Sequence, residues 1–242
     1  MVRDAGDVVN FSVVVPLHNE EANVERLLST TRESLARSQY VDRYEVICVN
    51  DGSTDATGDL LSRAVSDTVV AFHLPKRSGQ SAALARGIGA ARYEIVGRID
   101  GDLQTSPDDF DLLLPLLNQG VDCAHGVRVH RQDTWVRRQS SRIANGFRRW
   151  VLGDEFQDIS CPLTVFRRAC VEHLTFFNSF HRYLPYLVQM QGYTVRQVPV
   201  RHFPRLAGKP KYGISNRLGV GLTSLFVVRW MARHYLGRGS PR

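Results

Sequence analysis

Cysteine is scarce in this chain, and its basic carboxyl-terminal part lacks an apolar run long enough to cross a membrane. The four cysteines, at positions 48, 123, 161 and 170, have neither the spacing of a metal site nor the density of a disulfide framework, so we expect a reducing, cytosolic compartment. The uncharged stretch between Arg217 and Arg229 has 11 residues, whereas a membrane-spanning helix needs about 20. Residues 1–10 contain two aspartates and no apolar core, so we expect no secretory signal there.

Internal repeats, low-complexity blocks and linkers are also missing, which favours one domain with a carboxyl-terminal appendage. At 242 residues, with 43% hydrophobic and 23% charged residues, the chain has the length and composition of a globular protein with a sizeable core. We expect the domain to occupy residues 1–204. A basic loop and a helical tail are expected at residues 205–242.

Acidic residues are absent from the last 70 positions. Residues 173–242 contain 11 Lys and Arg and no Asp or Glu, whereas residues 1–172 contain 20 basic and 24 acidic residues; the formal net charge is +7. A basic segment of this kind favours phosphate groups, a membrane surface or nucleic acid, unless it is only a solvated tail. Aromatic residues are not interleaved with the basic ones as in nucleic-acid-binding modules, so we expect no nucleic-acid partner.

Short apolar runs alternate with helical periodicity through the first hundred residues. Strands that are apolar throughout and separated by helices predict a mostly parallel α/β sheet with helices on both faces. Asn19 is expected to cap the first helix. The predicted buried face of that helix consists of Val24, Leu27, Leu28, Thr31 and Leu35. The expected strands are 11–16, 44–49, 69–74 and 93–99, and the expected helices are 20–35, a helix ending at 65, and 81–91.

The alternation weakens after residue 107, and the chain ends in a helical tail. Strands are expected at 122–127, 165–166 and 193–200, and helices at 108–117, 137–152 and 182–191. Residues 215–231 predict an amphipathic helix flanked by Arg and Trp, which suits a membrane interface. A helix packed on the domain, or an oligomer contact, is the alternative.

The most informative stretch is Ile-Asp-Gly-Asp-Leu-Gln at residues 99–104. Asp100 and Asp102 point the same way in an extended chain, at the end of an expected strand. Two carboxylates and an amide suit a hard divalent cation, and a solvated turn is the alternative. Ligands of parallel α/β sheets bind beyond the carboxyl ends of the strands. We therefore expect residues 16–20, Asp51 and Arg77 at the same site.

Three motifs in this order and spacing resemble glycosyltransferase family 2. They are Val-Val-Val-Pro-Leu-His-Asn-Glu-Glu at 13–21, Val-Asn-Asp-Gly-Ser-Thr-Asp at 49–55 and Asp-Gly-Asp-Leu-Gln at 100–104. Segments 126–128, 158–163, 166–168 and 204–212 are similar to the polyprenyl-phosphate (dolichyl-phosphate mannose synthase-like) branch. The resemblance implies a GT-A (Rossmann-like) nucleotide-diphospho-sugar transferase fold. It also implies an inverting, metal-dependent hexosyltransferase that moves a sugar from a GDP- or UDP-sugar to undecaprenyl or dolichyl phosphate.

The resemblance also implies roles for individual residues on the donor side. A carboxylate accepts hydrogen bonds only, which suits the imide or ribose groups assigned to Asp51, although Asp51 also fits a helix-capping turn. Arg77 lies just before a helix start, where its guanidinium and backbone N–H groups could converge on an anion; an exposed surface arginine is the alternative. The implied nucleotide-binding residues are Pro16, Glu20, Asp51, Arg77 and Asp100. The implied ligands of Mg²⁺ or Mn²⁺ are Asp100, Asp102 and Gln104.

On the acceptor side the resemblance implies a pocket for a phosphate. Its residues would be Arg128, Arg137 and Ser141, with Arg205 and Lys211 closing over the site, and the catalytic set would be Asp100, Asp102 and Arg128. A phosphate monoester is already ionised near pH 7, because its second pKa is about 6. Such a nucleophile needs no protein base, so we expect structural or solvated roles for His18, His125, His130, His173, His181 and His202.

The leading hypothesis is thus a peripheral enzyme of the cell envelope, at the cytoplasmic face of a membrane. One rival is a family 2 enzyme acting on a soluble or glycan acceptor, which would require a general base. A second rival is a catalytically silent nucleotide-binding membrane scaffold, which the intact Asp100, Asp102 and Gln104 disfavour.

Overall fold

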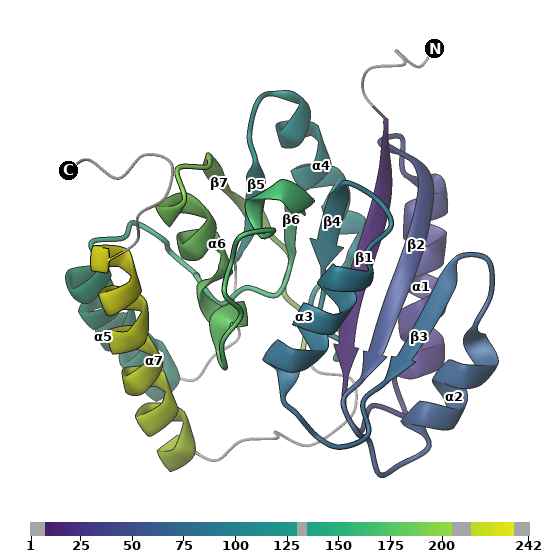
Figure 1. Ribbon diagram of the computed structural model, residues 1–242, viewed down its shortest axis with the longest axis horizontal. Coiled ribbons are helices and arrows are strands. Elements are labelled where there is room, and N and C mark those ends of the chain that lie inside the picture. The colour runs from purple at the N-terminus through teal and green to yellow at the C-terminus, as the bar shows by residue number, and fades with distance from the viewer. Residues whose placement is uncertain (1–7, 130–134, 205–213, 235–242) are drawn as a thin grey trace.

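A seven-stranded sheet with the strand order β3-β2-β1-β4-β6-β5-β7 forms the centre of the protein (Figure 1). The computed structural model describes residues 8–129, 135–204 and 214–234, and for residues 135–142 and 214–220 only the backbone. β6 runs antiparallel to β4 and β5, and the other pairings are parallel. The expectation of a mostly parallel sheet is confirmed. The strands are β1 (Val9–Leu17), β2 (Val41–Asn50), β3 (Val69–His73), β4 (Ile95–Arg98), β5 (Cys123–Arg128), β6 (Thr164–Arg167) and β7 (Val195–Val200).

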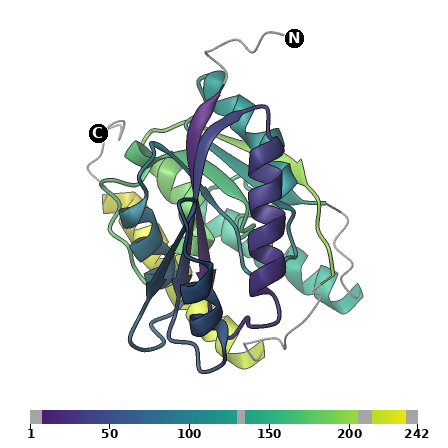
Figure 2. The ribbon, with the colours of Figure 1, turned by 90° about the vertical axis from the view of Figure 1, so that its right-hand side faces the viewer.

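Helices cover both faces of the sheet, as the sequence predicts (Figure 2). Alternating β1 residues face opposite sides: Val13 and Val15 lie in one core cluster with α1, α2 and α4, and Val14 lies in the other with α3, α5, α6 and α7. The helices are α1 (Val24–Arg37), α2 (Thr57–Ala64), α3 (Gln80–Ala90), α4 (Phe110–Asn118), α5 (Trp135–Leu152), α6 (Phe180–Met190) and α7 (Ile214–His234), with short 3₁₀ turns at η1 (Pro107–Asp109) and η2 (Arg168–Cys170).

The first helix begins later than its sequence pattern indicates. The prediction that Asn19 caps it is wrong, because Asn19 has a φ of 50° and α1 starts at Val24. The Asn19 side chain instead accepts from the Thr54 N–H at 2.8 Å and donates to the Thr54 hydroxyl at 3.3 Å. It therefore ties together the loops after β1 and β2. The predicted face is confirmed, since the buried residues of α1 include Val24, Leu27, Leu28, Thr31 and Leu35.

The carboxyl-terminal helix packs against the domain on one side. Leu225 and Val228 are buried in the second core cluster, and the Tyr183 hydroxyl on α6 donates to the Gly221 carbonyl. Leu222, Phe226, Val227 and Trp230 on the same helix are exposed, so apolar residues occupy its outer face as well as its inner one. None of the described helices is both long enough and apolar enough to span a membrane. The division at residue 204 stays a prediction.

All four cysteines lie within the described residues as buried thiols without disulfide bonds.

Candidate active site

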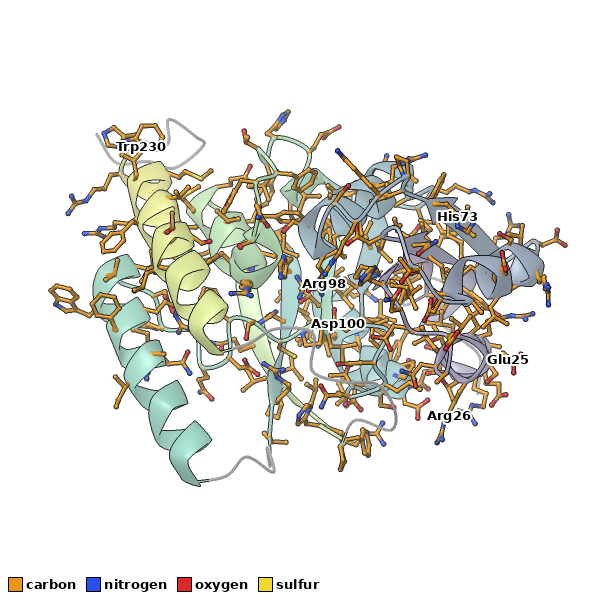
Figure 3. All side chains as sticks on the ribbon, turned by 90° about the horizontal axis from the view of Figure 1, so that it is seen from below. Glu25, Arg26, His73, Arg98, Asp100 and Trp230 are labelled. Atoms are coloured by element: carbon orange, nitrogen blue, oxygen red, sulfur yellow. The ribbon has the colours of Figure 1, made fainter. Side chains whose placement is uncertain are left out.

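A cavity of about 460 Å³ opens at the carboxyl ends of β1, β2 and β4. Figure 3 views the molecule from below Figure 1, the side toward which the β1 and β2 arrows of Figure 1 point, and labels Arg98 and Asp100 close together. Sequence-predicted residues that line the cavity are Pro16, Glu20, Asp51, Arg77, Asp100, Asp102, Gln104 and Arg128. Leu17 and His18, within the expected range 16–20, line it too, and so do residues that the sequence analysis did not assign to the site: Gln80, Arg98, Gly101, Ser160, His181 and Arg182. The roles of the predicted residues stay predictions.

Asp51 joins the loop after β2 to the loop before α3. Its carboxylate accepts from the Ser78 N–H at 2.6 Å and from the Gly79 N–H at 2.9 and 3.1 Å. Gly52 has a φ of 59°, and a Cβ there would lie 2.4 Å from the backbone nitrogen of Arg77. Only glycine allows this close approach. The Ser78 and Gly79 N–H groups beside Arg77 therefore converge on the Asp51 carboxylate, and the nucleotide-binding role of Arg77 stays a prediction.

Asp100 lies half-buried at the end of β4 and accepts from the Gln80 side-chain amide at 2.7 Å. Burial and the neighbouring charge of Asp102 raise the pKa of Asp100 to about 6, although Arg98, Arg128 and the Gln80 hydrogen bond act in the opposite direction. The Asp102 carboxylate accepts from the Gln104 N–H at 3.2 Å. The two carboxylates therefore lie close enough for the charge of Asp102 to raise the pKa of Asp100.

The donor set fits the divalent cation that the family resemblance implies. Asp100, Asp102 and Gln104 line one cavity and offer carboxylate and amide oxygens, which Mg²⁺ and Mn²⁺ accept. Within the part of the chain that the structure describes, no three His, Cys, Asp or Glu side chains form a ready-made metal cluster. Protein ligands here would leave coordination positions for substrate phosphates.

Gln104 also fixes the segment that follows β7. Its carbonyl accepts from the Phe203 N–H at 2.8 Å and lies 3.1 Å from the His202 Nδ1. The neighbouring Arg201 forms an ion pair with the buried Asp109 at 2.7 Å. The segment that precedes Arg205 and Lys211 is therefore hydrogen-bonded to the loop that contains Asp100, Asp102 and Gln104. Arg205 and Lys211 themselves lie outside the described residues.

Two arginines beside the carboxylates already have protein partners. Arg98 is 2% exposed. It donates to the carbonyls of Pro162 at 2.9 Å, Cys161 at 3.3 Å and His181. Its burial lowers its pKa, an effect that Asp100 opposes. Arg98 could have been suspected from sequence, since a charged residue rarely stands in an apolar strand directly before an acidic motif.

Arg128, at the end of β5, forms a two-pronged ion pair with Asp158. Its Nε lies 2.6 Å from Oδ2 and its Nη2 lies 2.9 Å from Oδ1, with Ser160 Oγ a further 3.3 Å partner of Nη2. The hydrogen bonds and charge of Asp158 raise the pKa of Arg128 despite its burial. Arg137 and Ser141 lie on α5, but their side chains are outside the described part of the structure.

Two buried histidines near the cavity, His181 and His125, are weak bases. His181 lines the cavity, contacts the Ser81 hydroxyl at 2.8 Å, and has a pKa lowered to about 3 by burial and by Arg98 and Arg182. His125 is buried between the Thr164 hydroxyl and the Asp158 carbonyl, and burial lowers its pKa to about 4. Both imidazoles are neutral at pH 7 and weakly basic.

Comparison with known protein sequences identifies relatives that match most of this chain. An undecaprenyl-phosphate 4-deoxy-4-formamido-L-arabinose transferase from Edwardsiella ictaluri is 31% identical over 84% of this chain and 63% of its own length. This chain therefore spans just under two thirds of that transferase. A dodecaprenyl-phosphate galacturonate synthase from Rhizobium johnstonii is 32% identical over 98% of this chain and 74% of its own length.

Solved structures show the same fold at lower identity. A Pyrobaculum calidifontis mannosyltransferase in complex with GDP-Man and Mn²⁺ has a TM-score of 0.66 and 20% identity, covering 97% of this chain and 66% of that one. A Mycobacterium tuberculosis glucosyl-3-phosphoglycerate synthase with Mn²⁺, UDP and its product has a TM-score of 0.67 and 21% identity, covering 91% and 80%. These similarities confirm the GT-A fold. The sequence profile described as Glycosyl transferase family 2 matches residues 12–183, and the chain belongs to that family.

Proposed function

We propose that this protein transfers a sugar from a nucleotide diphosphate sugar to the phosphate of a polyprenyl phosphate, with inversion at the anomeric carbon. The observation that carries the proposal is one cavity containing both the carboxylate pair Asp100 and Asp102 and the cation Arg128. The names of the Edwardsiella and Rhizobium relatives, which transfer formamido-arabinose and galacturonate, support a polyprenyl-phosphate acceptor. They do not favour mannose, so the proposal leaves the sugar open.

The residues of the cavity suit this reaction. Asp100, Asp102 and Gln104 would hold Mg²⁺ or Mn²⁺, which when bound neutralises the donor diphosphate and assists its departure. Asp51 holds the turn before α3 beside the expected nucleotide site. An oxygen of the acceptor phosphate forms the bond to the anomeric carbon as the bond from that carbon to the diphosphate breaks. The phosphate is ionised near pH 7 and needs no protein base, which agrees with the weak basicity of His181, one of the histidines that line the cavity.

A membrane surface is proposed on the outer sides of α5 and α7, which lie side by side (Figure 1). Trp150 is 79% exposed and Trp230 is 63% exposed, and Trp230 lies at the outer end of α7 in Figure 3. Aromatic and aliphatic side chains with nearby arginines are typical of helices that lie in a membrane interface. The exposed apolar residues are Ile143, Phe147 and Trp150 on α5 and Leu222, Phe226, Val227 and Trp230 on α7. This surface supports a peripheral location on a membrane, and we propose the cytoplasmic face.

Flotation with vesicles tests the membrane surface. The wild-type protein is expected to float with vesicles that contain anionic phospholipid, and the double substitution W150E/W230E is expected to abolish flotation without changing the circular dichroism spectrum. The exposed Val65, which lies after α2 and away from these helices, provides the control V65E. Equal flotation of W150E/W230E and wild type would exclude this surface.

A donor panel with solvent extraction tests the function. The purified protein is incubated with Mn²⁺, undecaprenyl phosphate and radiolabelled UDP- or GDP-sugars. Transfer to the lipid places the label in the organic phase. Label that remains in an aqueous product would favour a soluble acceptor, and nucleotide binding without turnover would favour the silent scaffold.

A further inference from the structure

Arg182 is a cavity residue that neither the sequence motifs nor the family assignment singled out. It is the third residue of α6, is half-buried, and lines the same cavity as Asp100 and Arg128. No hydrogen-bond acceptor or carboxylate contacts its guanidinium within residues 8–129, 143–204 and 221–234. By contrast, Arg98 is committed to three carbonyls and Arg128 to Asp158. A half-buried guanidinium with five donors and no described acceptor is ready to bind an oxyanion.

The start of α6 is rigidly held, so Arg182 is directed by the fold. Ser179, which precedes the helix, has a φ of 80°, an uncommon conformation for a non-glycine residue. Its N–H donates to the Ser81 hydroxyl at 2.8 Å, and the same hydroxyl contacts the His181 ring at 2.8 Å. Arg98 donates to the His181 carbonyl. Contacts from α3 and β4 thus fix Ser179 and His181, and His181 directly precedes Arg182.

The sheet order places the helix that carries Arg182 on the Arg128 side of the sheet. Asp51 and Arg77 follow β2 and β3, at one edge of the sheet, and Asp100 follows β4 near its middle. Arg128 ends β5 on the other side, and α6 packs against β5 and β7 as well as against α3. A donor bound near Asp51 with its diphosphate near Asp100 would therefore leave the Arg128 and Arg182 end for the second substrate.

This end also adjoins the proposed membrane surface. Tyr183, the residue after Arg182, donates through its hydroxyl to the Gly221 carbonyl of α7. α7 carries the exposed Phe226 and Trp230. A lipid whose chain lies at α7 would present its headgroup phosphate to the first turn of α6.

We propose that Arg182 binds the phosphate of the polyprenyl-phosphate acceptor and shares it with Arg128. The inference rests on the proposed function and adds a binding residue to it. Arg128 has its Nε and Nη2 donors directed at Asp158, so it offers an incoming phosphate fewer donors than Arg182 does. Two guanidinium groups would hold the nucleophile without protonating it, because arginine stays charged at every physiological pH.

Steady-state kinetics of R182Q and R182K test the assignment, with the nucleotide sugar that the donor panel identifies. Loss of a charge-assisted pair is expected to raise the KM for undecaprenyl phosphate by roughly 10- to 150-fold in R182Q. The KM for the nucleotide sugar is expected to change less than about twofold, and R182K to be intermediate because lysine keeps the charge but not the planar fork. The matched control is R196Q, which removes an exposed arginine from β7.

Binding measured without turnover separates the remaining outcomes. Calorimetric titration with farnesyl phosphate is expected to show weakened binding by R182Q but not by R196Q. A raised KM for the nucleotide sugar alone would mean that Arg182 contacts the donor, and unchanged constants for both substrates would mean that it binds neither; either result overturns the proposal. If wild-type protein glycosylates no lipid phosphate, the proposed function itself fails, whatever the variants do.

Discussion

Replacing Asp158 by asparagine tests whether a largely buried ion pair holds Arg128 in the cavity. The Arg128 and Asp158 side chains are 15% and 10% exposed, and their contact is 2.6 Å at its shortest. Removing one partner of a buried pair costs about 3–5 kcal/mol, because the remaining charge stays desolvated. This pair borders a cavity, so we expect D158N to lower the free energy of unfolding by about 3 kcal/mol. For a chain of this size that loss lowers the Tm by about 6–12 °C.

Thermal and urea unfolding followed by circular dichroism measure this loss. The control is D108N, because Asp108 pairs with Arg37 at 3.4 Å and with Arg201 at 3.7 Å while its side chain is 50% exposed. Exposed pairs contribute at most about 1 kcal/mol. A double-mutant cycle of D158N with R128Q is expected to yield a favourable coupling energy above about 1 kcal/mol. If D158N loses no more stability than D108N, the reasoning about the Arg128 pair is refuted.

Three further predictions concern the metal site, the pH dependence and the loop beside Asp51. D102N should abolish turnover and weaken Mn²⁺ binding in calorimetry while preserving the circular dichroism spectrum; near-wild-type activity would contradict the metal assignment. In the folded protein the pKa values of His125 and His181 are lowered to about 4 and about 3, whereas in the unfolded chain they are about 6.5. As the pH falls below about 6.5, these histidines therefore bind protons in the unfolded chain but not in the folded protein. The free energy of unfolding should therefore fall by up to about 1.4 kcal/mol per pH unit for each histidine between pH 6.5 and 4, and H125Q should unfold with a shallower dependence in urea titrations at several pH values. G52A should weaken nucleotide binding at least tenfold, because its Cβ would displace the Arg77 backbone. G89A is the control: a Cβ at Gly89 has no atom within 4 Å, so this variant should gain about 0.5–1 kcal/mol in its free energy of unfolding. Equal melting temperatures of the two variants would contradict this account.

Much of the fold could be predicted because its signals are local. The alternation of apolar strands with helices predicts the parallel half of the sheet, and the 3.6-residue period of α1 predicts its buried face. The structure differs where a side chain has a distant partner. Asn19 does not cap α1, because its hydrogen bonds to Thr54 join two loops 35 residues apart. β6, only four residues long, pairs antiparallel with β4 and β5, an insertion that no periodicity indicates.

The sequence by itself predicted that the residues assigned to the donor side would meet in one cavity. Asp51, Arg77 and Asp100 follow successive parallel strands, and the carboxyl ends of such strands meet at one edge, so their convergence needs no knowledge of distant contacts. Only the tertiary structure decided which further residues reach the cavity. Arg98 binds carbonyls 63 to 83 residues away, and Arg182 reaches the cavity because α6 packs across β5 and β7. Patterns with periods of 2 and 3.6 residues carry no information about such pairings, since these depend on how complete elements pack.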